Sequence, residues 1–380
     1  MNRVAERPYS GVRVLDLTRE LGSYAARLFA DLGADVIRVE RKLAATSDNA
    51  EAADNVADAS SIFLNASKRI VTLDFGAEKD REKLANLVQG AALVFYEPDV
   101  MRDEMLGLLA GIPGSRVITV ISYFGLTGPY ADYVGSDLVV QALGGIAYLS
   151  GQRNRSPLRI GGGQSTIVAS IYAAVAAAAA FWDTETRGLP HLLDISTQEA
   201  FAHSLQNAPQ MYELEQVVPR RDANALPIMQ GVFACRDGHV FLAAPPFMTS
   251  QWDDIVRWMD ETGFAEAARL KDDEWKDPKA GANRELRAEF RAIFEHFLSG
   301  ISRSQVAQEC IQRKILIAPV STMADLPKDP QLIHRKFFTS MPSEDKGNLT
   351  FPGAPYSLSE PVWRAQPTKH VDNKHEALEW

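Results

Sequence analysis

The chain has 380 residues, of which 46% are hydrophobic and 23% charged, a composition that fits a folded protein of two or three domains and excludes a disordered chain. Its 40 basic and 49 acidic side chains give a formal net charge of -9, without the basic excess that binding to nucleic acid requires. The two cysteines, Cys235 and Cys310, are too few for a disulfide framework and lack zinc-site spacing, so a cytoplasmic location is expected.

The first part of the chain predicts a parallel α/β sheet. Its start, MNRVAERPYSGVRV, has no apolar stretch behind the basic residues, so no secretory signal is predicted. The strand VRVLDL from Val12, a helix over Tyr24–Leu32 and the strand ADVIRVE then form a βαβ unit. Further strands are predicted at Arg69–Phe75, Ala92–Glu97 and Arg116–Ser122, with helical stretches between them. This alternation predicts helices on both faces of the sheet.

The middle of the chain predicts two helices, over Leu138–Leu149 and Ile167–Trp182, and a strand over His191–Thr197. The second helix is the most apolar run of the chain. It is rich in alanine and shorter than the roughly 20 residues needed to cross a bilayer. It therefore predicts a buried helix, and no membrane partner is expected.

A second domain is predicted after the polar stretch between Pro219 and Pro227. The segment GVFACRDGHVFLAA alternates apolar and polar residues around Asp237-Gly238, which predicts a hairpin. Amphipathic helices are predicted at Trp252–Met259 and Arg284–Phe297, and the tail is expected to return to the first domain. The predicted division is a large domain over 1–215, a smaller α+β domain over 216–328 and a C-terminal return over 329–380.

The first strand-to-helix turn, TRELGSY, lies where open α/β sheets bind ligands. The second strand ends in Glu40, where dinucleotide-binding folds place a ribose-binding carboxylate. The turn contains only Gly22, so the GxGxxG fingerprint is missing. A structural βαβ unit is therefore favoured over a nicotinamide site.

Basic residues cluster near the ends of two predicted strands. Arg38, Arg41 and Lys42 belong to the second strand and its end, and Lys68 and Arg69 precede the third. Such clusters are either solvated strand termini or, taken together, a site that holds a polyphosphate through charge-assisted hydrogen bonds.

Two segments in the middle of the chain are candidates for catalysis. The loop RIGGGQST, at 159–166, either offers backbone amides to an anion or an oxyanion, or is a tight loop with Ser165 or Thr166 as N-cap. Ile167 replaces the second glycine of a GxSxG elbow, which disfavours a serine hydrolase. Asp137 is either a catalytic carboxylate or a helix-start charge. The seven histidines lack metal-ligand spacing, so no metal site is predicted.

In combination and in order, several segments resemble the class III coenzyme A transferases, the CaiB/BaiF family, which includes formyl-CoA transferase and alpha-methylacyl-CoA racemase. The matching stretches cover nearly the whole chain: VRVLDLTRELGSYAARLFADLGADVIRVE, FLNASKRIVTLDF, FGLTGPYADYVGSDLVVQALGGIAYLSG, RGLPHLLDIST, IAPVSTMADLPKDPQLIHRKFF and FPGAPYSLS. The resemblance implies a Rossmann-like large domain built from both chain ends, a smaller middle domain and an interlocked dimer. It also implies transfer of CoA between an acyl-CoA and a carboxylic acid, with CoA or acyl-CoA as substrate and no tightly bound cofactor.

The resemblance further implies that CoA binds to the N-terminal domain. The positions that it assigns to CoA binding are Arg19, Leu21, Arg41, Lys68, Arg69, Tyr96, Arg102, Ser136 and Asp137.

At the catalytic position the chain departs from the family. Transferases of the family form a mixed anhydride, and then an enzyme thioester, on an aspartate whose register position is Thr166 here. An ester on threonine would be a sink, because it does not exchange acyl groups as an anhydride does. Racemases of the family use a histidine at the position of Ser136, so that base is missing too.

Three interpretations follow. The chain is the subunit without the aspartate in a heteromeric transferase, partnered with a homologue that retains it, as in two-subunit members such as benzylsuccinate CoA-transferase. Alternatively, another carboxylate, with Asp137 as the candidate, performs modified CoA-ester chemistry such as isomerisation or racemisation. The third interpretation is a CoA-ester binding protein without turnover. We predict the first, with a homodimer as the alternative to a heteromer.

Overall fold

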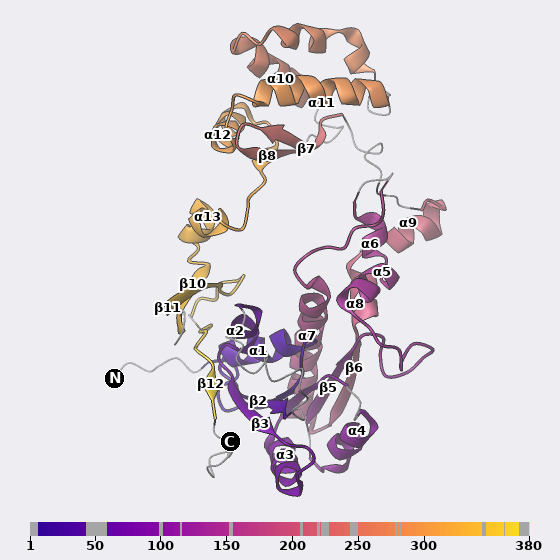
Figure 1. The fold of residues 1–380 in the computed structure, drawn as a ribbon, viewed down its shortest axis with the longest axis vertical. Coiled ribbons are helices and arrows are strands. Elements are labelled where there is room, and N and C mark those ends of the chain that lie inside the picture. Colours follow the sequence, from indigo (N-terminus) through magenta and orange to yellow (C-terminus); the bar gives the residue numbers. More distant parts are fainter. Residues whose placement is uncertain are drawn as a thin grey trace, which may run out of the picture. The chain divides into compact units, whose positions relative to one another are not determined.

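The structure, a computed structural model, describes residues 7–42, 59–98, 102–114, 116–151, 155–205, 208–218, 221, 228–243, 250–277, 280, 283–343, 347–360, 362–371 and 380. The chain forms two compact units (Figure 1). The large unit consists of Met1–Gly151, Pro157–Pro219 and His334–Trp380, and the small unit of Gln152–Ser156 and Arg220–Ile333. The main divisions fall a few residues after the predicted 215/216 and 328/329.

The large unit is built on a seven-stranded sheet with the order β12-β3-β2-β1-β4-β5-β6. Neighbouring strands are parallel, as the alternation of strands and helices predicts. The strands are β1 (Arg13–Leu17), β2 (Asp35–Arg41), β3 (Arg69–Leu73), β4 (Leu93–Tyr96), β5 (Val117–Ser122), β6 (His191–Ser196) and β12 (Lys369–His370). Because β1 pairs with both β2 and β4, the direction of winding reverses beside β1, and such a reversal opens a crevice at the carboxyl ends of the strands.

Helices cover both faces of this sheet (Figure 1). The helices α1 (Ser23–Asp31) and α7 (Gln164–Arg187) pack on one face, and α3 (Glu78–Gly90) and α4 (Arg102–Gly111) on the other. Successive strand residues point to opposite faces, so Val14 belongs to the first core and Leu15 to the second. The other helices of this unit are α2 (Ala59–Asn65), α5 (Asp137–Leu143), α6 (Ile146–Leu149), α8 (Thr197–Ser204) and α9 (Ala208–Glu215).

The alanine-rich helix α7 is longer than predicted and is buried on one side only. Ala169, Ala173 and Ala177 lie in the core, whereas Val175 is 67% and Trp182 73% exposed. By length and composition this helix could cross a membrane, but it packs on β5, β6 and α1 as a core helix of the large unit. The predicted buried helix is therefore buried on the side that packs in the core and exposed on its outer side.

The predicted helix over Leu138–Leu149 is two helices, α5 and α6. The backbone of Gly145 between them has φ of 88°, a left-handed conformation that ends one helix and starts the next in a new direction. The sequence shows this break as the Gly144-Gly145 pair, which the helical periodicity on either side obscured.

The tail, from His334 onward, belongs to the large unit. After α13 (Pro330–His334), β10 (Phe338–Ser343) and β11 (Gly347–Pro352) form an antiparallel hairpin. Strand β12 then pairs in parallel with β3 at the edge of the large sheet. The Ser67 and Gln366 backbones also join these distant segments, since the Ser67 N–H donates to the Gln366 carbonyl at 2.7 Å.

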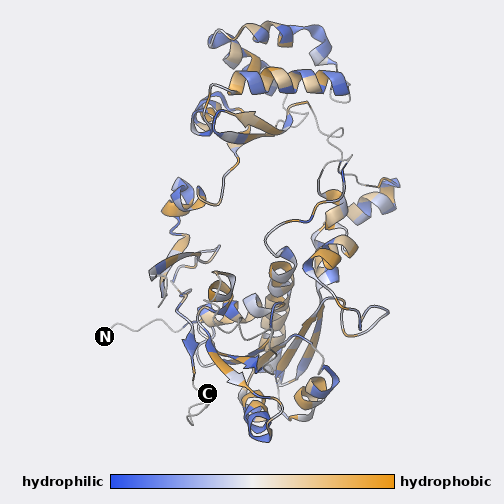
Figure 2. Ribbon diagram, in the orientation of Figure 1, coloured by the Kyte–Doolittle hydropathy of each residue, from blue (hydrophilic) through white to orange (hydrophobic). Residues whose placement is uncertain are grey.

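The small unit has an antiparallel sheet of β7 (Gln230–Cys235), β8 (Gly238–Ala243) and β9 (Ile317–Pro319). Its helices are α10 (Ser250–Glu261), α11 (Arg284–Leu298) and α12 (Arg303–Arg313), with shorter 3-10 segments at Ala265–Lys271, Asp273–Lys276 and Leu326–Lys328. Polar and apolar residues alternate along α11 (Figure 2), and Phe290 and Phe294 on its apolar side pack against Phe233. Cys235 pairs with Gly238, so the hairpin turn is Arg236-Asp237, one residue earlier than predicted.

Candidate functional site

A cavity of about 1290 Å³ lies in the large unit where β1, β2, β4 and β5 end. Its lining comes from the turn after β1, the end of β2, the segment after β4, the first turn of α4 and the loop after β5. This is the position at which open parallel sheets bind ligands, because the connections on either side of the reversal leave in opposite directions. Of the residues that the resemblance assigns to CoA binding, those that line the cavity are Arg19, Leu21, Arg41, Tyr96 and Arg102. Arg38 of the basic cluster and Glu40 line it too.

The turn between β1 and α1 is held by a carboxylate from the neighbouring strand. The Oε2 atom of Glu97 accepts hydrogen bonds from the backbone N–H groups of Arg19, Glu20 and Leu21 at 2.7, 2.7 and 2.9 Å. Burial raises the pKa of Glu97, although these hydrogen bonds and the Arg19 guanidinium oppose the shift. The Arg19 side chain itself is 65% exposed and lies 3.5 Å from Glu97 Oε1.

Below this turn lies a buried polar network. The Lys68 ammonium is fully buried and donates to Asp16 Oδ2 at 2.7 Å and to the Ser23 carbonyl at 2.7 Å. Arg38 donates to the Ser23 and Asn65 side chains, both at 2.8 Å. Burial lowers the pKa of Lys68 to about 8, against the attraction of Asp16. Lys68 is thus enclosed and is not part of the cavity wall.

Two of the predicted arginines have different surroundings in the cavity. Arg41 is exposed at the end of β2, with its guanidinium carbon 5.8 Å from the centre of the Phe75 ring. Arg102 is partly buried and donates to Asp132 at 2.9 Å and to the carbonyls of Leu126 and Ala131. Arg102 therefore fixes the loop that follows β5, whereas Arg41 lies exposed at the cavity edge beside Phe75.

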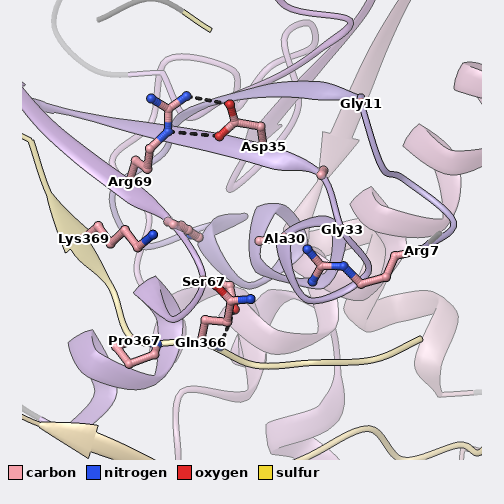
Figure 3. Close-up of a pocket in the computed structure, with 12 residues that line it drawn as sticks. Arg7, Gly11, Ala30, Gly33, Asp35, Ser67, Arg69, Gln366, Pro367 and Lys369 are labelled. Atoms are coloured by element: carbon pink, nitrogen blue, oxygen red, sulfur yellow. Dashed lines mark hydrogen bonds and ion pairs between the residues drawn. The ribbon is translucent and has the colours of Figure 1, made fainter. Parts of the chain in front are cut away.

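Arg69 lies at the opposite edge of the sheet. It begins β3, and its guanidinium forms a two-point ion pair with Asp35, the first residue of β2, at 3.0 and 2.6 Å. Figure 3 shows this pair in a separate cavity of about 240 Å³, which Arg7 and Lys369 also line. The adjacent residues Lys68 and Arg69 of the basic cluster both line this small cavity, and neither lines the large one.

Asp137 joins the start of α5 to the start of α7. Its Oδ1 accepts from the Ser165 hydroxyl at 2.5 Å and the Ser165 N–H at 3.1 Å, and its Oδ2 accepts from Gln141 at 2.9 Å. Arg159 forms an ion pair with the same carboxylate at 2.8 Å. Burial raises the pKa of Asp137, but these hydrogen bonds and Arg159 more than offset burial and bring the pKa below its ordinary value.

The two remaining predicted positions also belong to helix starts. Thr166 is buried in the first turn of α7, directly after Ser165. Ser136 is the N-cap of α5, where its hydroxyl accepts from the Val139 N–H at 3.4 Å. Neither residue is part of the large cavity lining, although Gly135 next to Ser136 is.

The structure brings residues into the cavity that the sequence did not single out. Glu97 and Tyr123 are the main examples. Burial, followed by the charges of Glu20 and Glu97, raises the pKa of Tyr123 to about 12, so its hydroxyl stays a donor at neutral pH. The only sequence signal for Glu97 is its position directly after a strand of the sheet. Among the described residues, no group of three His, Cys, Asp or Glu side chains is placed to hold a metal ion.

Known proteins match this chain over nearly its whole length. Residues 9–373 match the family model for CoA-transferase family III. The chain is 33% identical over 372 residues to subunit BbsE of succinyl-CoA:(R)-benzylsuccinate CoA-transferase from Thauera aromatica, which covers 94% of this chain and 89% of that protein. It is 24% identical to the alpha subunit of succinyl-CoA–L-malate CoA-transferase from Chloroflexus aurantiacus, with 93% and 83% covered.

The fold matches as well. The crystal structure of a CaiB/BaiF family protein from Brucella suis superposes with a TM-score of 0.84 at 24% identity, and the match covers 98% of both chains. Sequence and fold agree, and the chain therefore belongs to CoA-transferase family III, as a class III CoA-transferase homologue.

Proposed function

We propose that this chain is the subunit without a catalytic aspartate in a heteromeric CoA-transferase of the cytoplasm. The enzyme would move CoA from an acyl-CoA to a carboxylic acid, and a homologous partner subunit would carry the aspartate. The names of the relatives support succinyl-CoA as the CoA donor, and two of them are subunits of larger enzymes. The substrate CoA thioester is bound without a tightly held cofactor.

The observation that carries this proposal is the state of the two candidate nucleophiles, Thr166 at the start of α7 and Asp137 at the start of α5. Thr166, at the register position of the family aspartate, is a buried hydroxyl that does not ionise at neutral pH. Asp137 has both oxygens engaged by Ser165, Gln141 and Arg159. A carboxylate held in this way is a poor nucleophile toward a thioester, because attack would break the bonds that tie α5 to α7.

The large cavity supports CoA binding by this chain. Arg41 and the Phe75 ring stand together at its edge, a combination suited to a phosphorylated adenosine. We expect Arg41→Gln to lower the affinity for CoA about 10- to 100-fold, because a hydrogen bond to a charged group is worth about 1.5–3 kcal/mol. Arg13→Gln is the matched control, an exposed arginine at the other edge of the sheet. Calorimetric titration with CoA measures the affinity of both variants. An equal loss of affinity in Arg41→Gln and Arg13→Gln would contradict the assignment of Arg41 to CoA binding.

The exposed side of α7 supports a partner subunit. Ile171, Val175 and Trp182 form one apolar stripe along this helix and are 46%, 67% and 73% exposed. Leu192 on the edge strand β6 is a further exposed apolar side chain. Apolar surface of this extent is typical of a subunit interface, and the interlocked arrangement of the family would cover it.

The proposal is tested by following the acyl group. The purified chain, with succinyl-CoA and a set of carboxylic acids, is expected to give neither transfer nor an acylated side chain by mass spectrometry. Addition of a homologous subunit that carries aspartate at the position of Thr166 is expected to restore transfer, with the acyl group on that subunit. Turnover by the chain alone would reject the proposal, and an acyl group on Asp137 would establish the modified-carboxylate alternative.

A gain-of-function variant sharpens this test. Thr166→Asp returns a carboxylate to the register position, and we expect it to form an acyl adduct that hydroxylamine cleaves. Thr166→Asn is the control, since it has the same shape without an ionisable group. If CoA binds tightly while neither the variant nor the mixed subunits become acylated, the chain is a CoA-ester binding protein without turnover.

A further inference from the structure

The turn between β1 and α1 directs its backbone donors to a group of the protein itself. Three successive N–H groups, those of Arg19, Glu20 and Leu21, converge on the single atom Glu97 Oε2. Glu97 is 6% exposed, and its own N–H donates to the Leu17 carbonyl at 3.4 Å. The carboxylate is therefore fixed both by its backbone and by the turn that it faces.

Successive backbone N–H groups in the first strand-to-helix turn of an open α/β sheet form an anion site, which dinucleotide-binding proteins use for pyrophosphate. In this chain a carboxylate oxygen accepts the same bonds. Its second oxygen, Oε1, lies 3.5 Å from the Arg19 guanidinium. A phosphate at this turn would find the amides occupied and would be repelled by the carboxylate, since like charges at close range disfavour each other.

Apolar and charged side chains both line the cavity beside the turn. Leu17 ends β1, Leu21 belongs to the turn and Leu126 follows β5, and Tyr123 lies in the same lining. Arg19 and Glu20 of the turn also line the cavity, but the Arg19 guanidinium faces the Glu97 carboxylate at 3.5 Å, so its charge is already balanced there. Arg41, at the end of β2, is an exposed cation of the same lining.

We propose that Glu97 is a positioning residue that fills the anion site of the β1–α1 turn, so that the turn receives the uncharged pantetheine arm of a CoA thioester and the phosphates lie toward Arg41. This inference rests on the proposed function for its ligand. The anion site itself depends only on the hydrogen bonds of this chain.

The first experiment separates the two halves of the ligand. Calorimetric titrations with CoA and with adenosine 3′,5′-bisphosphate are compared for the native chain, Glu97→Ala, Glu97→Gln and the control Glu82→Ala, an exposed glutamate on α3. We expect Glu97→Ala to bind CoA about 10- to 100-fold more weakly and the bisphosphate within about twofold of the native chain. Glu97→Gln keeps an oxygen acceptor without the charge, and its affinity for CoA is expected to lie between that of the native chain and that of Glu97→Ala.

The second experiment uses small anions and requires no CoA. Acetate or inorganic phosphate, at constant ionic strength, is expected to raise the melting temperature of Glu97→Ala by entering the vacated site. The native chain and Glu82→Ala are expected not to respond. Acetate is also expected to restore the CoA affinity of Glu97→Ala, which the loss of a merely structural contact would not allow.

The outcomes of the two experiments are distinct. Native CoA affinity in Glu97→Ala, or no response of this variant to either anion, would overturn the assignment of Glu97. An equal loss of affinity for CoA and the bisphosphate would overturn the placement of the pantetheine arm. If the native chain does not bind CoA but Glu97→Ala responds to acetate, the proposed function fails while the anion site stands.

Discussion

Single residues in the large unit show how the same side chain type takes different roles according to its partners. Lys68 and Arg69 are adjacent and both basic, yet Lys68 is enclosed with Asp16 while Arg69 pairs with Asp35 at the amino ends of the strands. The partners come from segments more than thirty residues away in sequence. A local cluster of basic residues therefore predicts where charge lies but not whether a side chain is buried. The sequence alone could not show that the surroundings of these two residues differ from those of Arg41.

Asp137 offers a test at this scale. Its folded-state pKa is lowered, so its stabilising contribution is present above the unfolded pKa of about 3.9 and is lost as the pH falls through the folded pKa. We expect Asp137→Asn to lower the free energy of unfolding by about 1 kcal/mol at neutral pH, a typical value for a helix-start acceptor. The difference from the native chain should shrink below about pH 4.

Urea unfolding from neutral to acid pH measures this difference. Glu185→Gln, at an exposed position of α7, is the control and should show a small difference from the native chain at neutral pH. A difference for Asp137→Asn that stays constant down to pH 3 would show that the carboxylate does not act as an ionised acceptor at the start of α7.

At the scale of elements, the sequence predicts most strands and helices of the sheet because their side chains repeat with the periods of the two structures. Strands β1 to β6 and the helices α1, α10 and α11 lie close to the predicted residues. The failures have local causes: the glycine pair between α5 and α6, the hairpin turn at Arg236-Asp237, and β12, which is too short to have a period.

The candidate site was less predictable than the fold. The resemblance to the family, and not the residue pattern, assigned Arg19, Leu21, Arg41, Tyr96 and Arg102 to CoA binding, and all five line the large cavity. The position of Glu97 directly after β4 does not reveal its role, because that role depends on the path of a turn that starts on another strand. Asp137 bonds to Ser165, the neighbour of Thr166 in the chain, only because α5 and α7 begin side by side.

The turn before α1 also makes a prediction about stability. Gly22 has φ of 82°, and a Cβ at this position would lie 2.3 Å from Ile121 Cδ1 in the core. We expect Gly22→Ala to cost at least about 1–2 kcal/mol for the left-handed backbone alone. Gly107→Ala is the matched control, because it lies in α4 with no atom near the added methyl group, and it should stabilise the chain by about 0.5–1 kcal/mol. Thermal unfolding compares the stability of the two variants. A Gly22→Ala variant as stable as the native chain would contradict the left-handed backbone and close packing at this position.

At the scale of the whole molecule, the two units have separate cores, and the large unit has an uncovered apolar stripe on α7. We expect Val175→Glu to shift the native assembly toward single chains, because a carboxylate there would be buried without a partner in an interface. Ile311→Glu on α12 of the small unit, where the side chain is 77% exposed, is the control. Light scattering after size-exclusion chromatography measures the mass, and an unchanged mass for Val175→Glu would exclude this stripe from the interface.

The pairing of β12 with β3 bears on how the polypeptide matures during translation. Lys369 pairs with Arg69, 300 residues earlier in the chain, so the ribosome must synthesise those 300 residues before this edge of the large sheet can close. The small unit, by contrast, has its hydrophobic cluster between Ile228 and Ile317 and can condense before β12 is synthesised. During this interval β3 remains an open edge strand, which is a site for pairing with other chains.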